Sequence, residues 1–226
     1  MDSKSEPVPI IVSMFVGESG AGQLAGLAGI GIFFLSAAVI PLYFSPFDEP
    51  PPRWNVLTRV LVDMFVPVGF VVFVIGLRHT IVSERPALEW LGTLCLALGL
   101  ALVVLTFVAH SIQAGSVLAA QERRPHPDWV RRGGSGAEGA LLIYGPRARL
   151  LTAAFLASVG SAIILTGALP GWTGWLAYAV GSVVPTIFYK TDPAFFYSVN
   201  GWGIPVAGGL LLGWVLMVGV LLVLRN

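Results

Sequence analysis

Six long apolar runs, separated by short polar segments, constrain the fold of this chain more than any other feature of its sequence. The runs cover about residues 24–44, 56–77, 88–118, 148–169, 174–189 and 202–224. A helix needs roughly 20 mostly apolar residues to cross a bilayer, and every run except the fifth reaches that length. None of the runs alternates like a strand of a membrane barrel. The sequence therefore predicts an all-α fold, a polytopic integral membrane helix bundle with about six transmembrane helices.

The amino-acid composition supports a lipid environment. Charged residues make up only 11% of the chain and hydrophobic residues 56%, whereas soluble domains carry roughly 25% charged residues. A chain with so few charges cannot cover a water-soluble globule, but it suits a bundle whose outer wall faces lipid. We predict a polar or interfacial N-terminus over residues 1–23 and a single transmembrane bundle over 24–226, with a long loop at about 121–147.

The residues present also exclude several functional classes. A net charge of +1 leaves no basic surface for nucleic acid. The single cysteine, Cys95, excludes an internal disulfide and a cysteine zinc cluster, and we expect no metal and no cofactor. A G-x-G-x-x-G pattern at 134–139 follows an arginine-rich segment rather than a strand, so we interpret it as a flexible linker. The sequence contains no H-E-x-x-H, P-loop or G-x-S-x-G motif.

Consecutive membrane helices alternate in direction, so the first, third and fifth connections must lie on one face of the membrane. Most of the arginine and lysine residues near the membrane belong to this odd-loop face. The positive-inside rule then places the odd-loop face in the cytoplasm and both termini outside. The excess of arginine over lysine, with abundant Ala, Gly and Val, is typical of a GC-rich bacterial genome. We therefore predict a multi-pass protein of the bacterial plasma membrane.

Ionisable residues inside the second apolar run are the best clue to function, because a charge at the centre of a membrane helix costs roughly 2.5–3.5 kcal/mol. Asn55, Arg59 and Asp63 recur every four residues and so share one helical face. Arg59 can reach Asp63 as an i,i+4 pair. Pro67 lacks the N–H that would otherwise bond to the carbonyl of Asp63.

Two further polar stripes occur in the third and fifth runs. The third run places Thr106, His110 and Gln113 on one face. The stripe of the fifth run comprises Tyr178, Ser182, Thr186 and Tyr189, and the same end of the bundle receives Arg147, Arg149, Tyr197 and Asn200. Because the helices alternate in direction, we expect these stripes to converge at the odd-loop face and the opposite half to be nearly all apolar. The predicted substrate-binding residues are Arg59, Asp63, His110 and Gln113.

Purely structural interpretations compete with this one. Arg59 and Asp63 form a satisfied pair that ties helices together if Arg59 extends to the level of the lipid phosphates. Serine and threonine hydroxyls commonly join membrane helices. The small-residue pairs Gly22/Gly26 and Gly209/Gly213 are expected to pack inside one bundle rather than to form a dimer.

Short segments of the chain carry a resemblance to a family. They are Gly76-Leu77-Arg78, the stretch Gly-Ala-Leu-Pro-Gly-Trp at 167–172, and Gly174-Trp175. With the order of the apolar runs, they resemble a broad set of uncharacterised actinobacterial multi-pass membrane proteins of the domain-of-unknown-function type. Many of those proteins have a basic residue after the proline, where this chain has Gly171. The resemblance covers the second to sixth runs and implies no activity and no site residue.

Three classes of function remain open. The first is binding or transporting a small molecule, lipid or ion in a polar cavity at the odd-loop face. The second is a membrane-embedded enzyme acting on an amphiphilic substrate, with His110 or Asp63 as catalytic proton acceptor and Arg59 stabilising a developing anion. The third is an accessory or structural membrane subunit. The expected partners are membrane lipids, a small amphiphilic ligand, and a homo- or hetero-oligomer in the membrane.

Overall fold

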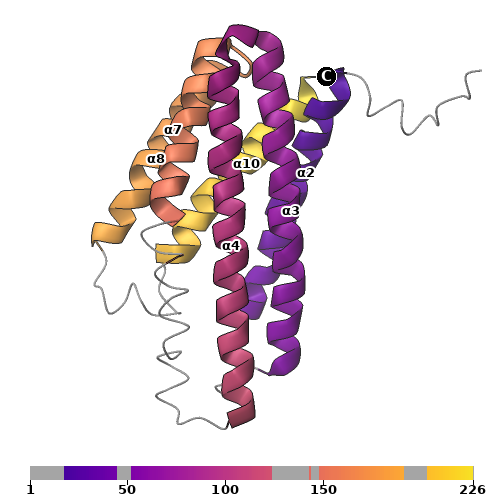
Figure 1. Ribbon diagram of the computed structural model, residues 1–226, viewed down its shortest axis with the longest axis vertical. Helices are drawn as coiled ribbons and strands as arrows, with labels where there is room; N and C mark the ends of the chain where they lie inside the picture. The colour runs from indigo at the N-terminus through magenta and orange to yellow at the C-terminus, as the bar shows by residue number, and fades with distance from the viewer. Residues whose placement is uncertain (1–17, 45–51, 124–142, 144–147, 191–202, 226) are drawn as a thin grey trace, which may run out of the picture.

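The computed structural model describes residues 18–44, 52–123, 143, 148–190 and 203–225. Within these ranges the backbone is helical and contains no strand. The helices are α2 (Glu18–Phe44), α3 (Arg53–Glu84), the short 3-10 helix η1 (Pro86–Leu88), α4 (Glu89–Arg123), α7 (Ala148–Thr166), α8 (Gly171–Lys190) and α10 (Gly203–Leu224) (Figure 1).

Five of the helices in the described ranges are long and apolar enough to cross a membrane. Their spanning segments are Gly20–Leu42, Trp54–Glu84, Pro86–Ile112, Ala148–Thr166 and Val206–Leu224. The sixth, α8, is 20 residues long and packs between α7 and α10. The predicted fold class, an α-helical membrane bundle of about six helices, is confirmed. The chain is a multi-pass membrane protein.

The helices extend beyond several of the predicted runs. α2 begins at Glu18, inside the segment predicted as a polar N-terminus, and α3 continues to Glu84 rather than ending near residue 77. α4 reaches Arg123 and so includes the first residues of the predicted loop. With 35 residues it is about 52 Å long, well beyond the roughly 30 Å hydrocarbon core. Residues 1–17, and all of 124–147 except Ile143, lie outside the described residues.

The helices alternate in direction and define two ends of the bundle (Figure 1). At one end, here called the turn end, α3, α7 and α10 finish and α4 and α8 begin. It holds η1 and the turn after α7, where Gly167 adopts a φ of 70° and its N–H bonds to the Ile163 carbonyl. The opposite end, the loop end, holds the starts of α3, α7 and α10 and corresponds to the odd-loop face.

The helices pack as a closed ring in the order α2, α3, α4, α7, α8, α10 and back to α2. Phe73, Phe155 and Trp214 fill the inside of the ring and are all fully or almost fully buried. The ring of Trp214 meets those of Phe73 and Phe155 edge-on, with centroids 6.4 and 6.3 Å away. All three lie ten or eleven residues from the turn end, at a depth of about 16 Å. An aromatic layer therefore closes the bundle near mid-membrane.

Glycines allow close backbone contact between some of the helices. A Cβ on Gly26 would lie 2.6 Å from the carbonyl oxygen of Gly219, so α2 and α10 can approach this closely only because both residues lack side chains. The prediction that the small-residue pairs pack inside the bundle therefore holds for Gly26. It is wrong for Gly209 and Gly213, where an added Cβ would meet nothing within 4 Å. The reason is rotation of α10, which presents those two glycines to the outside.

Candidate functional site

Asp63 of α3 and His110 of α4 meet across the interface between their helices. The distance between His110 Nε2 and Asp63 Oδ2 is 3.8 Å, and the side chains are 24% and 15% exposed, respectively. This distance is too long for a direct hydrogen bond, so the contact is electrostatic and depends on the charge of His110. The sequence placed both residues on converging faces, and the structure brings them together.

The pair lies close to the membrane boundary at the loop end. Asp63 precedes the last residue of α3 by twenty-one positions, and His110 follows the first residue of α4 by the same number. Both therefore lie about 31 Å from the turn end along their helices, which matches the roughly 30 Å thickness of the hydrocarbon core. The spanning segment of α4 ends at Ile112, two residues beyond His110. A polar head group or water can reach this depth.

Two arginines lie at neighbouring depths, one on each side of the level of the pair. Arg59 is one helical turn from Asp63 toward the loop end and is partly buried. Arg149 is in the first turn of α7 and only 3% exposed, at a depth of about 26 Å from the turn end. α7 packs against both α4 and α3. The sequence predicts Arg149 at this end of the bundle, but Arg149 is not among the predicted binding residues. The signal was available, because a charged residue inside a spanning segment is costly and rare.

The remaining residues of the predicted stripes on α3 and α4 behave differently. The side chain of Gln113 lies outside the described residues. Asn55 is fully buried, and its Nδ2 donates a 3.1 Å hydrogen bond to the carbonyl of Leu42 at the end of α2. Residue 46 is a proline, so it has no N–H to offer that carbonyl. Asn55 therefore joins α2 to α3. Thr106 donates to the Leu102 carbonyl of its own helix.

The predicted contribution of α8 to this site is wrong for its described residues. Ser182 and Thr186 are exposed, and each hydroxyl donates to a carbonyl three residues earlier in α8. Tyr178 contacts Ser161 of α7 instead. α8 packs on α7 and α10. Its polar stripe can face outward because serine and threonine hydroxyls donate hydrogen bonds to carbonyls of their own helix and need no partner on another one. Tyr189, Arg147, Tyr197 and Asn200 lie outside the described residues or have side chains that do.

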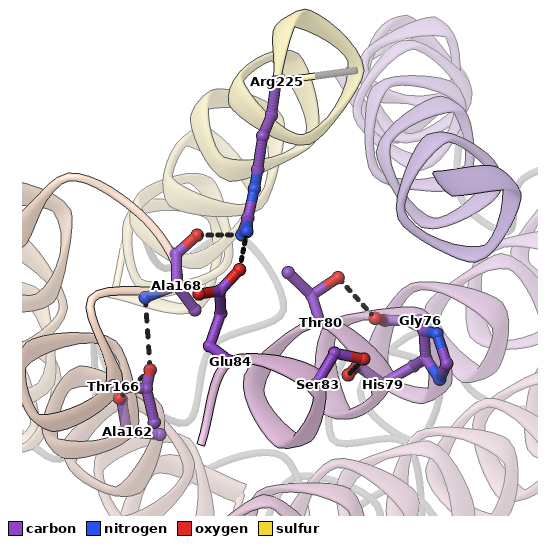
Figure 2. A network of polar contacts seen from close by, with 9 residues as sticks. All are labelled: Gly76, His79, Thr80, Ser83, Glu84, Ala162, Thr166, Ala168 and Arg225. Atoms are coloured by element: carbon purple, nitrogen blue, oxygen red, sulfur yellow. Dashed lines mark hydrogen bonds and ion pairs between the residues drawn. The ribbon is translucent and has the colours of Figure 1, made fainter. Parts of the chain in front are cut away.

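The turn end carries its own polar network, so the prediction of a nearly apolar opposite half is wrong. Figure 2 shows the guanidinium of Arg225, after α10, between the carboxylate of Glu84 and the carbonyl of Ala168. Arg85 donates to the Leu165 carbonyl at 3.0 Å. These contacts join the ends of α3 and α10 to the end of α7 and the turn that follows it.

A second ion pair at the turn end joins Arg78 of α3 to Glu89 of α4 at 2.7 Å. The physical reason for both pairs is the length of α3, which stays helical through 78–84 and carries these side chains across to neighbouring helices. Glu84 and Arg225 are each about one-third exposed. The network therefore links the helix ends at the surface of the bundle and does not form a buried site. Among the described residues, no group of three or more His, Cys, Asp or Glu side chains could hold a metal ion.

Comparison with known proteins adds no functional assignment. No family model, curated protein or solved structure matches the chain. The function is therefore inferred from the geometry of the Asp63–His110 pair and from Arg59 and Arg149 at neighbouring depths.

Proposed function

We propose that this multi-pass membrane protein binds a small amphiphile with an anionic head group at the loop end, with Asp63, His110, Arg59 and Arg149 around the head group. The observation that carries the proposal is the 3.8 Å contact between His110 and Asp63 across two spanning helices. Ionisable groups in membrane helices are costly, and they are kept mainly where they bind ligands or move protons.

Charge favours an anion over a cation. Arg59 and Arg149 carry two positive charges and Asp63 one negative charge, so these three groups together are net positive, and protonation of His110 adds to this. An arginine presents several N–H donors in a plane that matches a carboxylate or phosphate. Depth favours an amphiphile, because a head group at this level leaves its alkyl chains in the hydrocarbon core.

The aromatic layer of Phe73, Phe155 and Trp214 supports binding rather than free passage. It lies about 15 Å from the Asp63–His110 level and fills the inside of the ring. Transport through the bundle would require these side chains to move, whereas binding at the loop end requires no such movement. The dry core therefore favours a site open to one leaflet.

Lipid retention measured by native mass spectrometry tests this proposal. The full chain is released from nanodiscs of phosphatidylcholine containing phosphatidylglycerol or phosphatidic acid, and retained lipid is counted for each variant. His110→Gln should lower retention of the anionic lipids by about tenfold, because it removes the positive charge that the imidazole carries when it is protonated. The matched control is His79→Gln, which changes a histidine of α3 near the turn end and should leave retention unchanged. Equal retention by wild type and His110→Gln would contradict the proposal.

The same pair supports a second candidate, a membrane enzyme. A histidine oriented by a carboxylate is the usual arrangement of a general base, and such contacts often shorten only when substrate binds. A time-dependent change in lipids extracted from the nanodiscs, abolished by His110→Ala, would favour this enzyme over a binding protein. If Asp63→Asn and His110→Ala both match the wild type in cells and in lipid retention, an accessory subunit becomes the better interpretation.

The resemblance to actinobacterial multi-pass membrane proteins leads us to propose a bacterial plasma membrane as the location. The arginine-rich composition supports this origin. Fractionation of a native host, with the chain detected by antibody, tests the location directly.

A further inference from the structure

A lateral cleft lies between α7 and α8, on the outer surface of the bundle and away from the Asp63–His110 pair. Its volume is about 390 Å³, and it is lined by Ser161, Ile164, Leu165, Trp175 and Tyr178. Leu165 and Trp175 are 51% and 66% exposed, so the cleft opens outward to lipid rather than toward the inside of the ring. None of the described residues that line it is charged.

A close contact between glycines positions the two hydroxyls in the cleft. A Cβ on Gly160 would lie 2.8 Å from the carbonyl oxygen of Gly174, and a Cβ on Gly174 would lie equally close to that of Gly160. α7 and α8 therefore touch backbone to backbone at this level. Ser161 follows Gly160 directly, and Tyr178 is one turn beyond Gly174, so their side chains meet beside the contact, with the two oxygens 2.5 Å apart.

The protons of both hydroxyls are already used. Ser161 Oγ donates to the Ala157 carbonyl at 2.8 Å. A hydroxyl has one proton and two lone pairs, so Tyr178 must be the donor in its hydrogen bond with Ser161. What the pair offers to a ligand is lone pairs only. A ligand group that can donate a hydrogen bond fits this pair, whereas a carbonyl, ester or phosphodiester oxygen finds no donor in the two hydroxyls.

The depth of the two hydroxyls and the uncharged lining of the cleft further restrict the chemical class of the ligand. Ser161 and Tyr178 lie five and seven residues from the turn-end limits of their helices, about 8–10 Å deep. On the same scale that puts the Asp63–His110 pair at the far boundary, this depth lies inside the hydrocarbon core, in the half nearer the turn end. An ammonium group would be desolvated here without a carboxylate beside it, which is costly. A neutral hydroxyl is the donor that fits.

We infer that the α7–α8 cleft binds a neutral lipid alcohol, whose hydroxyl donates to the Tyr178 and Ser161 oxygens and whose alkyl part lies along Ile164, Leu165 and the ring of Trp175. The head of a diacylglycerol and the hydroxyl of a sterol-like alcohol share this chemistry. This site is independent of the proposed anion site, because it lies at the other end of the bundle and on its outer surface.

Photolabelling of the full chain in phosphatidylcholine nanodiscs tests the inference. The probes carry a diazirine in the alkyl part: a diacylglycerol, its methyl ether, a sterol alcohol and that sterol's methyl ether. Labelled peptides are mapped by mass spectrometry. The wild type should label in α7 and α8, and one of the two alcohols should label about fivefold more than its ether, the ratio expected for one net hydrogen bond. The alcohol that shows this ratio tells which of the two lipids, the diacylglycerol or the sterol, the cleft binds.

The Ser161→Ala variant tests the direction of the hydrogen bond between Tyr178 and Ser161. Without the Ser161 oxygen, the Tyr178 hydroxyl regains a proton to donate, so the ether should now label nearly as well as the alcohol. Ser182→Ala removes an exposed hydroxyl one turn further along α8 and should leave the wild-type ratio unchanged. Equal labelling of alcohol and ether in the wild type overturns the inference, because ordinary annular lipid would behave that way. Labelling mapped mainly outside α7 and α8 overturns it as well, and neither result depends on a variant folding.

Discussion

Asp63 of α3 and His110 of α4 lie 3.8 Å apart, and each is twenty-one residues from the turn-end limit of its helix. Two antiparallel helices of matching length thus bring a carboxylate and an imidazole to the same depth, near the boundary of the membrane. The contact is electrostatic and partly shielded from water, so the two side chains should be energetically coupled.

A double-mutant cycle measures this coupling. Asp63→Asn and His110→Gln should each lower thermal stability in detergent, while the double variant should lose less than the sum of the two. Residues in direct contact typically show an interaction energy of about 0.5–3 kcal/mol. Additive losses would mean that the two side chains do not interact. His79→Gln combined with Asp63→Asn is the matched control and should be additive, since His79 lies more than four turns away on the same helix.

The aromatic layer should dominate the stability of the bundle. Trp214 is 2% exposed, contacts Phe73 and Phe155, and donates a hydrogen bond to the Thr173 carbonyl. Trp214→Ala should cost about 3–5 kcal/mol, the usual range for truncating a buried tryptophan. Trp90→Ala is the control, because Trp90 is 63% exposed on the outside of α4, and its loss should be well under that of Trp214. Thermal unfolding followed by circular dichroism compares the two, and equal losses would contradict the described core.

Two glycines that look alike in the sequence should respond oppositely to alanine. In Gly26→Ala the new methyl group would lie 2.6 Å from the Gly219 carbonyl oxygen, which should cost about 1–3 kcal/mol through overpacking. In Gly209→Ala the methyl group would meet nothing within 4 Å, so stability should stay the same or rise by up to about 1 kcal/mol from helix propensity. Melting temperatures in one detergent separate the outcomes, and a stable Gly26→Ala variant would argue against the α2–α10 contact.

The ion pair at the turn end should matter little for stability. Glu84 and Arg225 are 38% and 35% exposed, and exposed pairs are worth about 0–1 kcal/mol and are screened by salt. Glu84→Gln should therefore lower the melting temperature slightly at low salt and not at all at 1 M salt. A large loss that persists at high salt would mean that the network is more deeply buried than its exposure indicates.

The apolar runs were sufficient to predict the fold class, because a bilayer admits few other structures for such a chain. They were less informative about helix ends. Ser83 and Glu84 are as compatible with a turn as with a last helical turn, and the structure keeps them helical. The choice depends on packing against α4 and α10, which local sequence does not encode.

The Asp63–His110 contact could be expected from the sequence, because shared helical faces and alternating helix direction bring the two residues to one level. The contact between Glu84 and Arg225 could not, since it joins positions 141 apart and depends on the ring closing between α2 and α10. The outward rotation of the α8 stripe was also unpredictable. Hydroxyls such as that of Ser182 bond to their own helix, so they do not indicate which face is buried.

Thiol accessibility tests most directly whether Asp63 and His110 share a site that water reaches. Cys95 is the only cysteine, so a Cys95→Ala background gives a clean reference for single-cysteine variants in proteoliposomes. With a membrane-impermeant anionic methanethiosulfonate, we expect the Asp63→Cys and His110→Cys variants to react and phosphatidylglycerol to slow both reactions. Ala109→Cys changes the neighbour of His110, which is 0% exposed, and should stay unreactive. If the Asp63→Cys and His110→Cys variants were as unreactive as Ala109→Cys, the shared wet site would not exist.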